Sequence, residues 1–149
     1  LLFDRPPAMI LPGAEVKNSA ISKGCIIRGT VSGSVLSPGV VVEYGARVID
    51  SILMQNTWVG SGAFLNKVVT DKEVAVGPDS SIGYGNIDIA NRLYPKHLST
   101  GITLIGKWVT VPEGAKIGTN CIIAQKVTNN MWPENLLLPD GEILDGLKK

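Results

Sequence analysis

The chain contains few aromatic residues, a single histidine and two cysteines. Phe, Trp and Tyr together make up 5% of the residues, so the core has to be built from aliphatic side chains. A catalytic zinc site of the three-histidine kind is disfavoured, because His97 has no histidine companions. Cys25 and Cys121 are too few for a disulfide framework and indicate a reducing compartment. We therefore expect a cytoplasmic protein in which both thiols fill small core positions.

Excess charge and long apolar segments are also missing. Lys and Arg number 14 against 13 Asp and Glu, which gives no general reason to expect nucleic acid or a membrane as partner. No apolar run approaches the ~18 residues of a transmembrane helix. The chain starts with Leu1 rather than Met and has no signal-peptide pattern, so we interpret it as a piece of a longer protein.

What the sequence does contain is a repeat of six residues. Near the C-terminus, aliphatic residues recur every six positions, and each is preceded two positions earlier by another small or aliphatic residue. Residues two apart on a strand share one face, whereas a helix would need a period near 3.6. The predicted inward pairs are Val109/Val111, Ala115/Ile117 and Cys121/Ile123, following Ile105 and followed by Val127, with Thr110, Lys116 and Ile122 facing outward.

The same pattern runs through the first half of the chain with slips. Val42, Val59 and Val76 are 17 residues apart, one short of three hexads. The expected inward residues are Ile21, Cys25, Ile27, Val31, Val42, Ala46, Val48, Ile52, Met54, Val59, Ala63, Leu65, Val69, Val76, Ser80 and Ile82. Residues that tolerate positive φ follow at the corners, namely Gly24, Gly45, Gly62, Asp79, Gly114 and Asn120.

A corner every six residues predicts an all-β fold, a triangular parallel β-helix of the hexapeptide-repeat type. We assign residues 13–128 to this solenoid, with about four coils before residue 82 and somewhat over one after residue 105. Residues 83–104 break the repeat and are interpreted as a loop excursion. Residues 129–149 form a non-repeat tail that is expected to cap the open end with Trp132 and the run 136–138.

The residues offer little catalytic chemistry. A hexapeptide acyltransferase needs a general base on the prism wall, and His97 lies in the excursion instead. We find no phosphate-cradling loop, no useful carboxylate pair and no Ser-His-Asp set, so we predict no catalytic residue and no metal site in this chain. Candidate anion-binding cations remain: Lys72 and Lys107, and the group of Arg92, Lys96 and His97 in the excursion.

Several segments resemble the C-terminal domain of glucose-1-phosphate adenylyltransferase (ADP-glucose pyrophosphorylase). They are residues 18–31, 34–40 and 50–54, together with the similar segments 68–72 and 101–107. The resemblance covers roughly residues 6–125 and weakens beyond Ile123. It implies a left-handed β-helix, and it makes residues 1–12 the linker from a missing N-terminal catalytic domain.

The resemblance also implies a function. The parent enzyme would convert ATP and glucose 1-phosphate into ADP-glucose and pyrophosphate for glycogen or starch synthesis, with Mg²⁺ in the missing catalytic domain and no cofactor in this fragment. The fragment would build a homo- or hetero-oligomer, a tetramer in the family, and contribute to an effector site. Lys72 and Lys107 match basic positions that contact anionic effectors. Two alternatives stay open, a hexapeptide-repeat acyltransferase and a non-catalytic structural solenoid.

Overall fold

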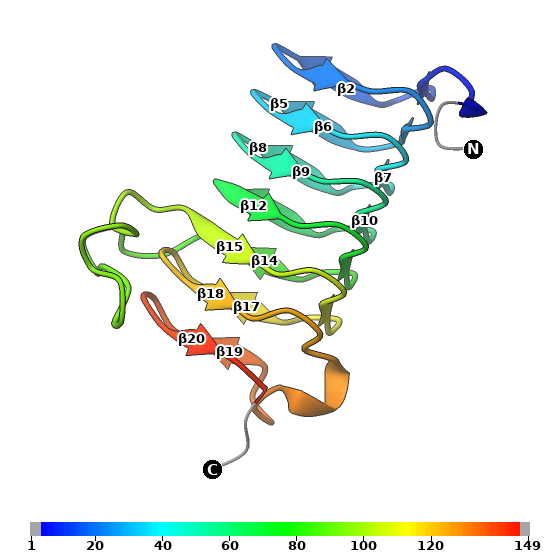
Figure 1. The fold of residues 1–149 in the computed structure, drawn as a ribbon. Coiled ribbons are helices and arrows are strands. Elements are labelled where there is room, and N and C mark those ends of the chain that lie inside the picture. The colour runs from blue at the N-terminus through cyan, green and yellow to red at the C-terminus, as the bar shows by residue number, and fades with distance from the viewer. Residues whose placement is uncertain (1–3, 147–149) are drawn as a thin grey trace.

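The chain folds into three parallel β-sheets that form the sides of a triangular prism. The structure is a computed structural model and describes residues 4–146. Each turn of the chain contributes one short strand to each sheet in the order A, B, C, except that the last turn within this range has no strand in sheet A, and Figure 1 shows the turns stacked from β2 down to β20. Sheets B and C each contain seven strands in the described part of the chain, so at a spacing of about 4.8 Å the stack is about 29 Å tall.

The strands are two or three residues long because a corner follows each of them. Sheet A consists of β1 (Met9–Ile10), β4 (Ile26–Ile27), β7 (Val41–Val42), β10 (Trp58–Val59), β13 (Ala75–Val76) and β16 (Thr110–Val111). Sheet B consists of β2 (Glu15–Lys17), β5 (Thr30–Ser32), β8 (Arg47–Ile49), β11 (Phe64–Asn66), β14 (Ser81–Ile82), β17 (Lys116–Ile117) and β19 (Leu137–Leu138). Sheet C consists of β3 (Ala20–Ile21), β6 (Val35–Leu36), β9 (Ile52–Leu53), β12 (Val68–Thr70), β15 (Thr103–Ile105), β18 (Ile122–Ile123) and β20 (Ile143–Leu144).

The core is a set of aliphatic columns that run along the prism. Val59 pairs in register with Val42 on one side and Val76 on the other, as the 17-residue spacing predicts. Ile105 pairs with Ile123, so the predicted 18-residue stacking is also confirmed. The predicted inward residues between 105 and 127 are all buried, and the six predicted corner residues all have positive φ. The handedness stays a prediction drawn from the resemblance.

The inward phase was wrong at two places on sheet C. Leu53 is buried and Met54 and Ile52 are exposed, although the six-residue count had placed the latter two inside. Thr70 is likewise buried, and Val69, which was expected inside, lies half-buried on the outer face. The reason is that the turn from sheet B to sheet C uses one residue fewer than the other two turns. Val48 and Leu53 are therefore five residues apart instead of six, which explains why these coils contain 17 residues rather than 18.

The solenoid also extends further at both ends than predicted. Strand β1 lies within residues 1–12, the segment expected to be a linker, and pairs with β4. Strands β19 and β20 lie within the expected non-repeat tail and pair with β17 and β18. The repeat was missed there because a 3₁₀ helix, Asn129–Met131, stands where a strand of sheet A would come. Next to it, the Trp132 indole donates to the carbonyl of Thr110, which places Trp132 over the end of sheet A.

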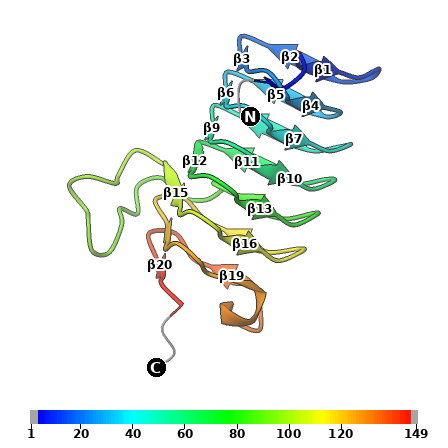
Figure 2. The ribbon, with the colours of Figure 1, turned by 45° about the vertical axis from the view of Figure 1, so that its right-hand side comes forward.

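The excursion leaves the prism between sheet B and sheet C. It begins after β14 and ends at β15, whose first residue is Thr103, so the last two residues of the predicted range 83–104 belong to a strand. Figure 2 shows the loop projecting sideways from the stack. Among residues 4–146, no helix is long and apolar enough to span a bilayer.

Candidate functional site

Lys72 and Lys107 lie one above the other at the same edge of the prism. We call this edge the C–A corner, because it is the column of turns that leads from each strand of sheet C to the next strand of sheet A. The backbone N–H of Trp108 donates to the carbonyl of Lys72 at 3.2 Å, so the two turns are adjacent. In sequence the lysines are 35 residues apart, and the excursion between them returns to the next turn of the stack. The predicted juxtaposition is therefore confirmed, at about one strand spacing of 4.8 Å.

The structure adds two residues that sequence reasoning missed. The backbone N–H of Lys126 donates to the carbonyl of Lys107 at 2.8 Å, which puts a third lysine on the next turn of the same corner. Trp108 lies between them, with its ring centroid 4.4 Å from Nζ of Lys107 and 5.4 Å from Nζ of Lys126. A lysine ammonium over an aromatic face is attracted by the ring quadrupole. The three lysines and Trp108 therefore form one cationic and aromatic surface, the lysine cluster.

Trp108 adopts an unusual backbone conformation for so large a residue. Its φ is +60°, and its side chain is 46% exposed. The corner positions above it are Gly39, Asn56 and Glu73, each also with positive φ. Glycine adopts this conformation at low cost, whereas a bulky side chain pays about 1–3 kcal/mol of strain. The corner thus holds a large aromatic ring in solvent at a conformational cost, which is typical of functional positions.

Two carboxylates share this corner, and both are engaged by neighbours. Oδ1 of Asp71 accepts the backbone N–H of Lys72 at 2.7 Å. Oε1 of Glu73 accepts the side-chain amide of Asn56 at 2.6 Å. The ammonium of Lys72 has no carboxylate partner among the described residues. The corner thus carries three lysines against two carboxylates, so its net charge is positive, which suits an anionic ligand.

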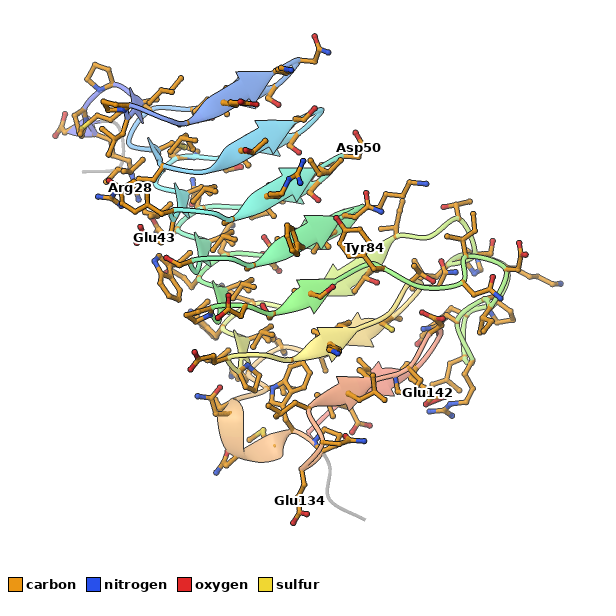
Figure 3. The ribbon with its side chains drawn as sticks, turned by 180° about the vertical axis from the view of Figure 1, so that it is seen from behind. Arg28, Glu43, Asp50, Tyr84, Glu134 and Glu142 are labelled. Atoms are coloured by element: carbon orange, nitrogen blue, oxygen red, sulfur yellow. The ribbon has the colours of Figure 1, made fainter. Side chains whose placement is uncertain are left out.

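The excursion is fixed to the prism by a buried asparagine. Asn120 is fully buried, and its amide nitrogen donates to the carbonyls of Ile87 and Ile89 at 3.1 and 2.9 Å. Its amide oxygen accepts the backbone N–H of Gly101 at 2.8 Å. A second tie is the ion pair between Arg92 of the excursion and Glu142, at 3.1 Å; Figure 3 labels Glu142 beside the excursion. The loop is therefore anchored at both ends and in its middle.

The remaining candidates from the sequence lie apart from the lysine cluster. His97 and Lys96 are exposed at the tip of the excursion, so the only histidine of the sequence is off the prism wall. Cys25 and Cys121 are free and fully buried, as predicted. Burial raises the pKa of both thiols, that of Cys121 to about 11. Neither thiol is poised as a nucleophile, because the reactive form is the thiolate.

The fold and the repeat define the class of the protein as a hexapeptide-repeat parallel β-solenoid. Residues 6–105 match the family described as GlmU-like, C-terminal hexapeptide. Because this match covers more than half of the sequence, the chain belongs to that family.

Curated relatives point to one kind of enzyme. The chain is 43% identical over 143 residues to glucose-1-phosphate adenylyltransferase of Thermomicrobium roseum, covering 95% of this chain and 33% of that protein. It is 38% identical over 129 residues to glucose-1-phosphate adenylyltransferase of Acetivibrio thermocellus, covering 87% of this chain and 30% of that protein. The chain therefore spans about a third of the length of these relatives and matches their C-terminal part.

A solved structure with a similar architecture is the acetyltransferase domain of PglB from Neisseria gonorrhoeae. It superposes with a TM-score of 0.36 and 23% identity, over 85% of this chain and 56% of that one. A likeness at this level carries no information about activity.

Proposed function

We propose that this chain is the C-terminal regulatory and assembly domain of a glucose-1-phosphate adenylyltransferase. The proposal is supported by the two relatives of that name, which share 38% and 43% identity with most of this chain. In the proposed parent, a preceding domain joins ATP and glucose 1-phosphate with the help of Mg²⁺ and releases pyrophosphate. This chain works beside that domain in the cytoplasm, as part of an oligomer.

The observation that carries the regulatory part of the proposal is the lysine cluster. Lys72, Lys107 and Lys126 come from three successive turns, and their ammonium groups repel one another in the absence of a counter-ion. A phosphorylated metabolite relieves this repulsion when it bridges the lysines, and Trp108 supplies a flat apolar surface for its carbon skeleton. An anionic effector at the C–A corner is therefore the ligand that this surface fits.

The activity test uses the chain both alone and joined to the preceding domain of its parent. The isolated chain should release no pyrophosphate from ATP, glucose 1-phosphate and Mg²⁺ above the blank. The joined protein should show a saturable rate that depends on Mg²⁺. A saturable rate from the isolated chain, or none from the joined protein, would contradict the proposal.

The effector test titrates fructose 1,6-bisphosphate, 3-phosphoglycerate and sulfate against the joined protein. The Lys72→Ala/Lys107→Ala variant should lose at least tenfold in affinity for the anion that binds, since each pair with a charged group contributes on the order of 1 kcal/mol. Binding to the unchanged protein should weaken as ionic strength rises.

The matched control for this test is the Lys17→Ala/Lys96→Ala variant. It removes the same charge from two exposed lysines away from the C–A corner. It should bind the effector as tightly as the unchanged protein. Equal loss of affinity in both double variants would mean that net charge, rather than this site, governs binding.

A further inference from the structure

A groove crosses the outer face of sheet B, away from the C–A corner. It consists of two adjoining hollows that share Ser81 and Tyr84. One, of about 450 Å³, is lined also by Lys116, Leu137 and Asp140. The other, of about 390 Å³, is lined by Ser81 and Tyr84 together with Arg47, Ile49 and Phe64. We call the two together the sheet B groove, and each hollow is within the size range of small-molecule sites.

The wall of the groove is an exposed pair of aromatic rings. Tyr84 stands at the start of the excursion, and Figure 3 shows it at the edge of sheet B. Its ring meets that of Phe64 nearly at a right angle, with 6.4 Å between the centroids and 80° between the planes. The two side chains are 49% and 39% exposed. The chain has only eight aromatic residues, and two of them form this exposed pair. The pair therefore offers an aromatic surface on which the ring of a ligand can stack.

A cation stands at each end of this platform. Arg47, Phe64, Ser81 and Lys116 occupy equivalent positions on four successive strands of sheet B. The backbones of Arg47 and Lys116 are therefore about 14 Å apart, three strand spacings. Neither side chain has an ion-pair partner among residues 4–146.

One acidic residue, Asp140, lines the groove, and both oxygens of its carboxylate accept backbone hydrogen bonds. Oδ1 of Asp140 accepts the N–H of Thr119 at 2.8 Å, and Oδ2 accepts the N–H of Asn86 at 2.9 Å. These bonds hold the carboxylate at the point where the excursion leaves the prism. They leave Lys116 as the charged donor of the larger hollow.

We propose that the sheet B groove binds a planar aromatic compound that carries a phosphate or carboxylate group. The ring lies against Tyr84 and Phe64, the anionic group is bound by Lys116 or Arg47, and the hydroxyl of Ser81 lies between the two hollows as a further donor. This site is independent of the lysine cluster, because sheet B is the side of the prism opposite the C–A corner. Its ligand differs from an aliphatic phosphorylated effector in requiring the ring.

The test measures the affinity of 1-naphthyl phosphate by isothermal titration, with inorganic phosphate and 1-naphthol as partial ligands. Naphthyl phosphate should bind at least tenfold more tightly than either partial ligand. The Tyr84→Ala and Lys116→Ala variants should each weaken its binding about tenfold, a loss that corresponds to about 1.4 kcal/mol. The matched controls are Tyr94→Ala and Lys96→Ala, which change the same residue types at the exposed tip of the excursion.

The outcomes separate this site from the proposed effector site. If naphthyl phosphate binds the Lys72→Ala/Lys107→Ala variant normally and Tyr84→Ala poorly, the groove is the site. If the loss appears only in the double lysine variant, the ligand sits at the C–A corner and the inference is overturned. Absence of binding at millimolar ligand, or equal losses in the controls, overturns it as well. Thermal melting of each variant checks that the exposed substitutions leave the fold intact.

Discussion

Replacing Leu53 by alanine should destabilise the protein far more than the same change at its neighbour Met54. Leu53 is fully buried between Leu36 and Thr70 in its column, whereas Met54 is 39% exposed. The hydrogen-bonded ladders fix the spacing of the turns above and below, so the cavity left at position 53 can collapse only partly. We expect Leu53→Ala to cost about 3–5 kcal/mol and Met54→Ala under about 1 kcal/mol.

Urea denaturation followed by circular dichroism measures this difference. With a slope of about 2 kcal/mol per molar urea, Leu53→Ala should lower the midpoint by about 1.5–2.5 M and Met54→Ala by less than about 0.5 M. Ile52→Ala is the second control, because Ile52 is 45% exposed on the outer face of sheet C. If Met54 or Ile52 proved the costly position, the six-residue count would be right and the five-residue turn wrong.

Two further predictions concern the buried polar groups. Asn120→Ala removes the hydrogen-bond partners of the Ile87 and Ile89 carbonyls and of the Gly101 N–H. Hydrogen exchange at the Gly101 amide should therefore accelerate, and the free energy of unfolding should fall by about 2–4 kcal/mol. Unchanged protection of this amide would contradict the anchoring role. Burial raises the pKa of Cys121 from an ordinary value of about 9 to about 11. Stability is therefore unaffected by ionisation of this thiol below about pH 9 and falls by about 3 kcal/mol as pH rises from about 9 to about 11, because only the unfolded thiol ionises readily there. The stability difference from Cys121→Ala should shrink over that range, and a flat difference would refute it.

The parts of the fold that the sequence could predict are those where two signals agree. Between residues 105 and 127 the inward pairs and the corner residues recur in the same phase, and the structure has them so. At Asp50 and Lys67 the signals conflict, because neither residue is a glycine and the turn is one residue short. Both have positive φ, 49° and 54°. A count of six cannot detect such a turn, since Ile52 and Leu53 are equally apolar.

The site was predictable to the extent that it follows from coil length. Lys72 and Lys107 could be placed together because an excursion has to return to the next turn of the stack. Trp108 could not be placed, because tryptophan is not a residue expected at a corner with positive φ. Tyr84 belongs to the excursion, whose path depends on the contacts of Asn120 rather than on the repeat. The position of Tyr84 thus depends on tertiary contacts that no local pattern contains.

The strain at Trp108 leads to a prediction in which two small substitutions differ in an unusual direction. Trp108→Gly and Trp108→Ala both remove the ring, and only alanine retains a Cβ at a φ of +60°. Glycine usually destabilises extended structure relative to alanine, but here it should be the more stable variant by about 1 kcal/mol. Both variants should lose the contacts with Lys107 and Lys126 and bind an anionic effector equally weakly.

Thermal melting and effector titration of the two variants, side by side, separate conformation from binding. If Trp108→Ala equalled or exceeded Trp108→Gly in stability, the backbone at this corner would be unstrained. If either variant kept the full affinity for the effector, the ring would be a structural residue. A gain in stability for glycine together with an equal loss of binding in both would mean that the chain tolerates a strained corner in order to hold an aromatic ring among three lysines.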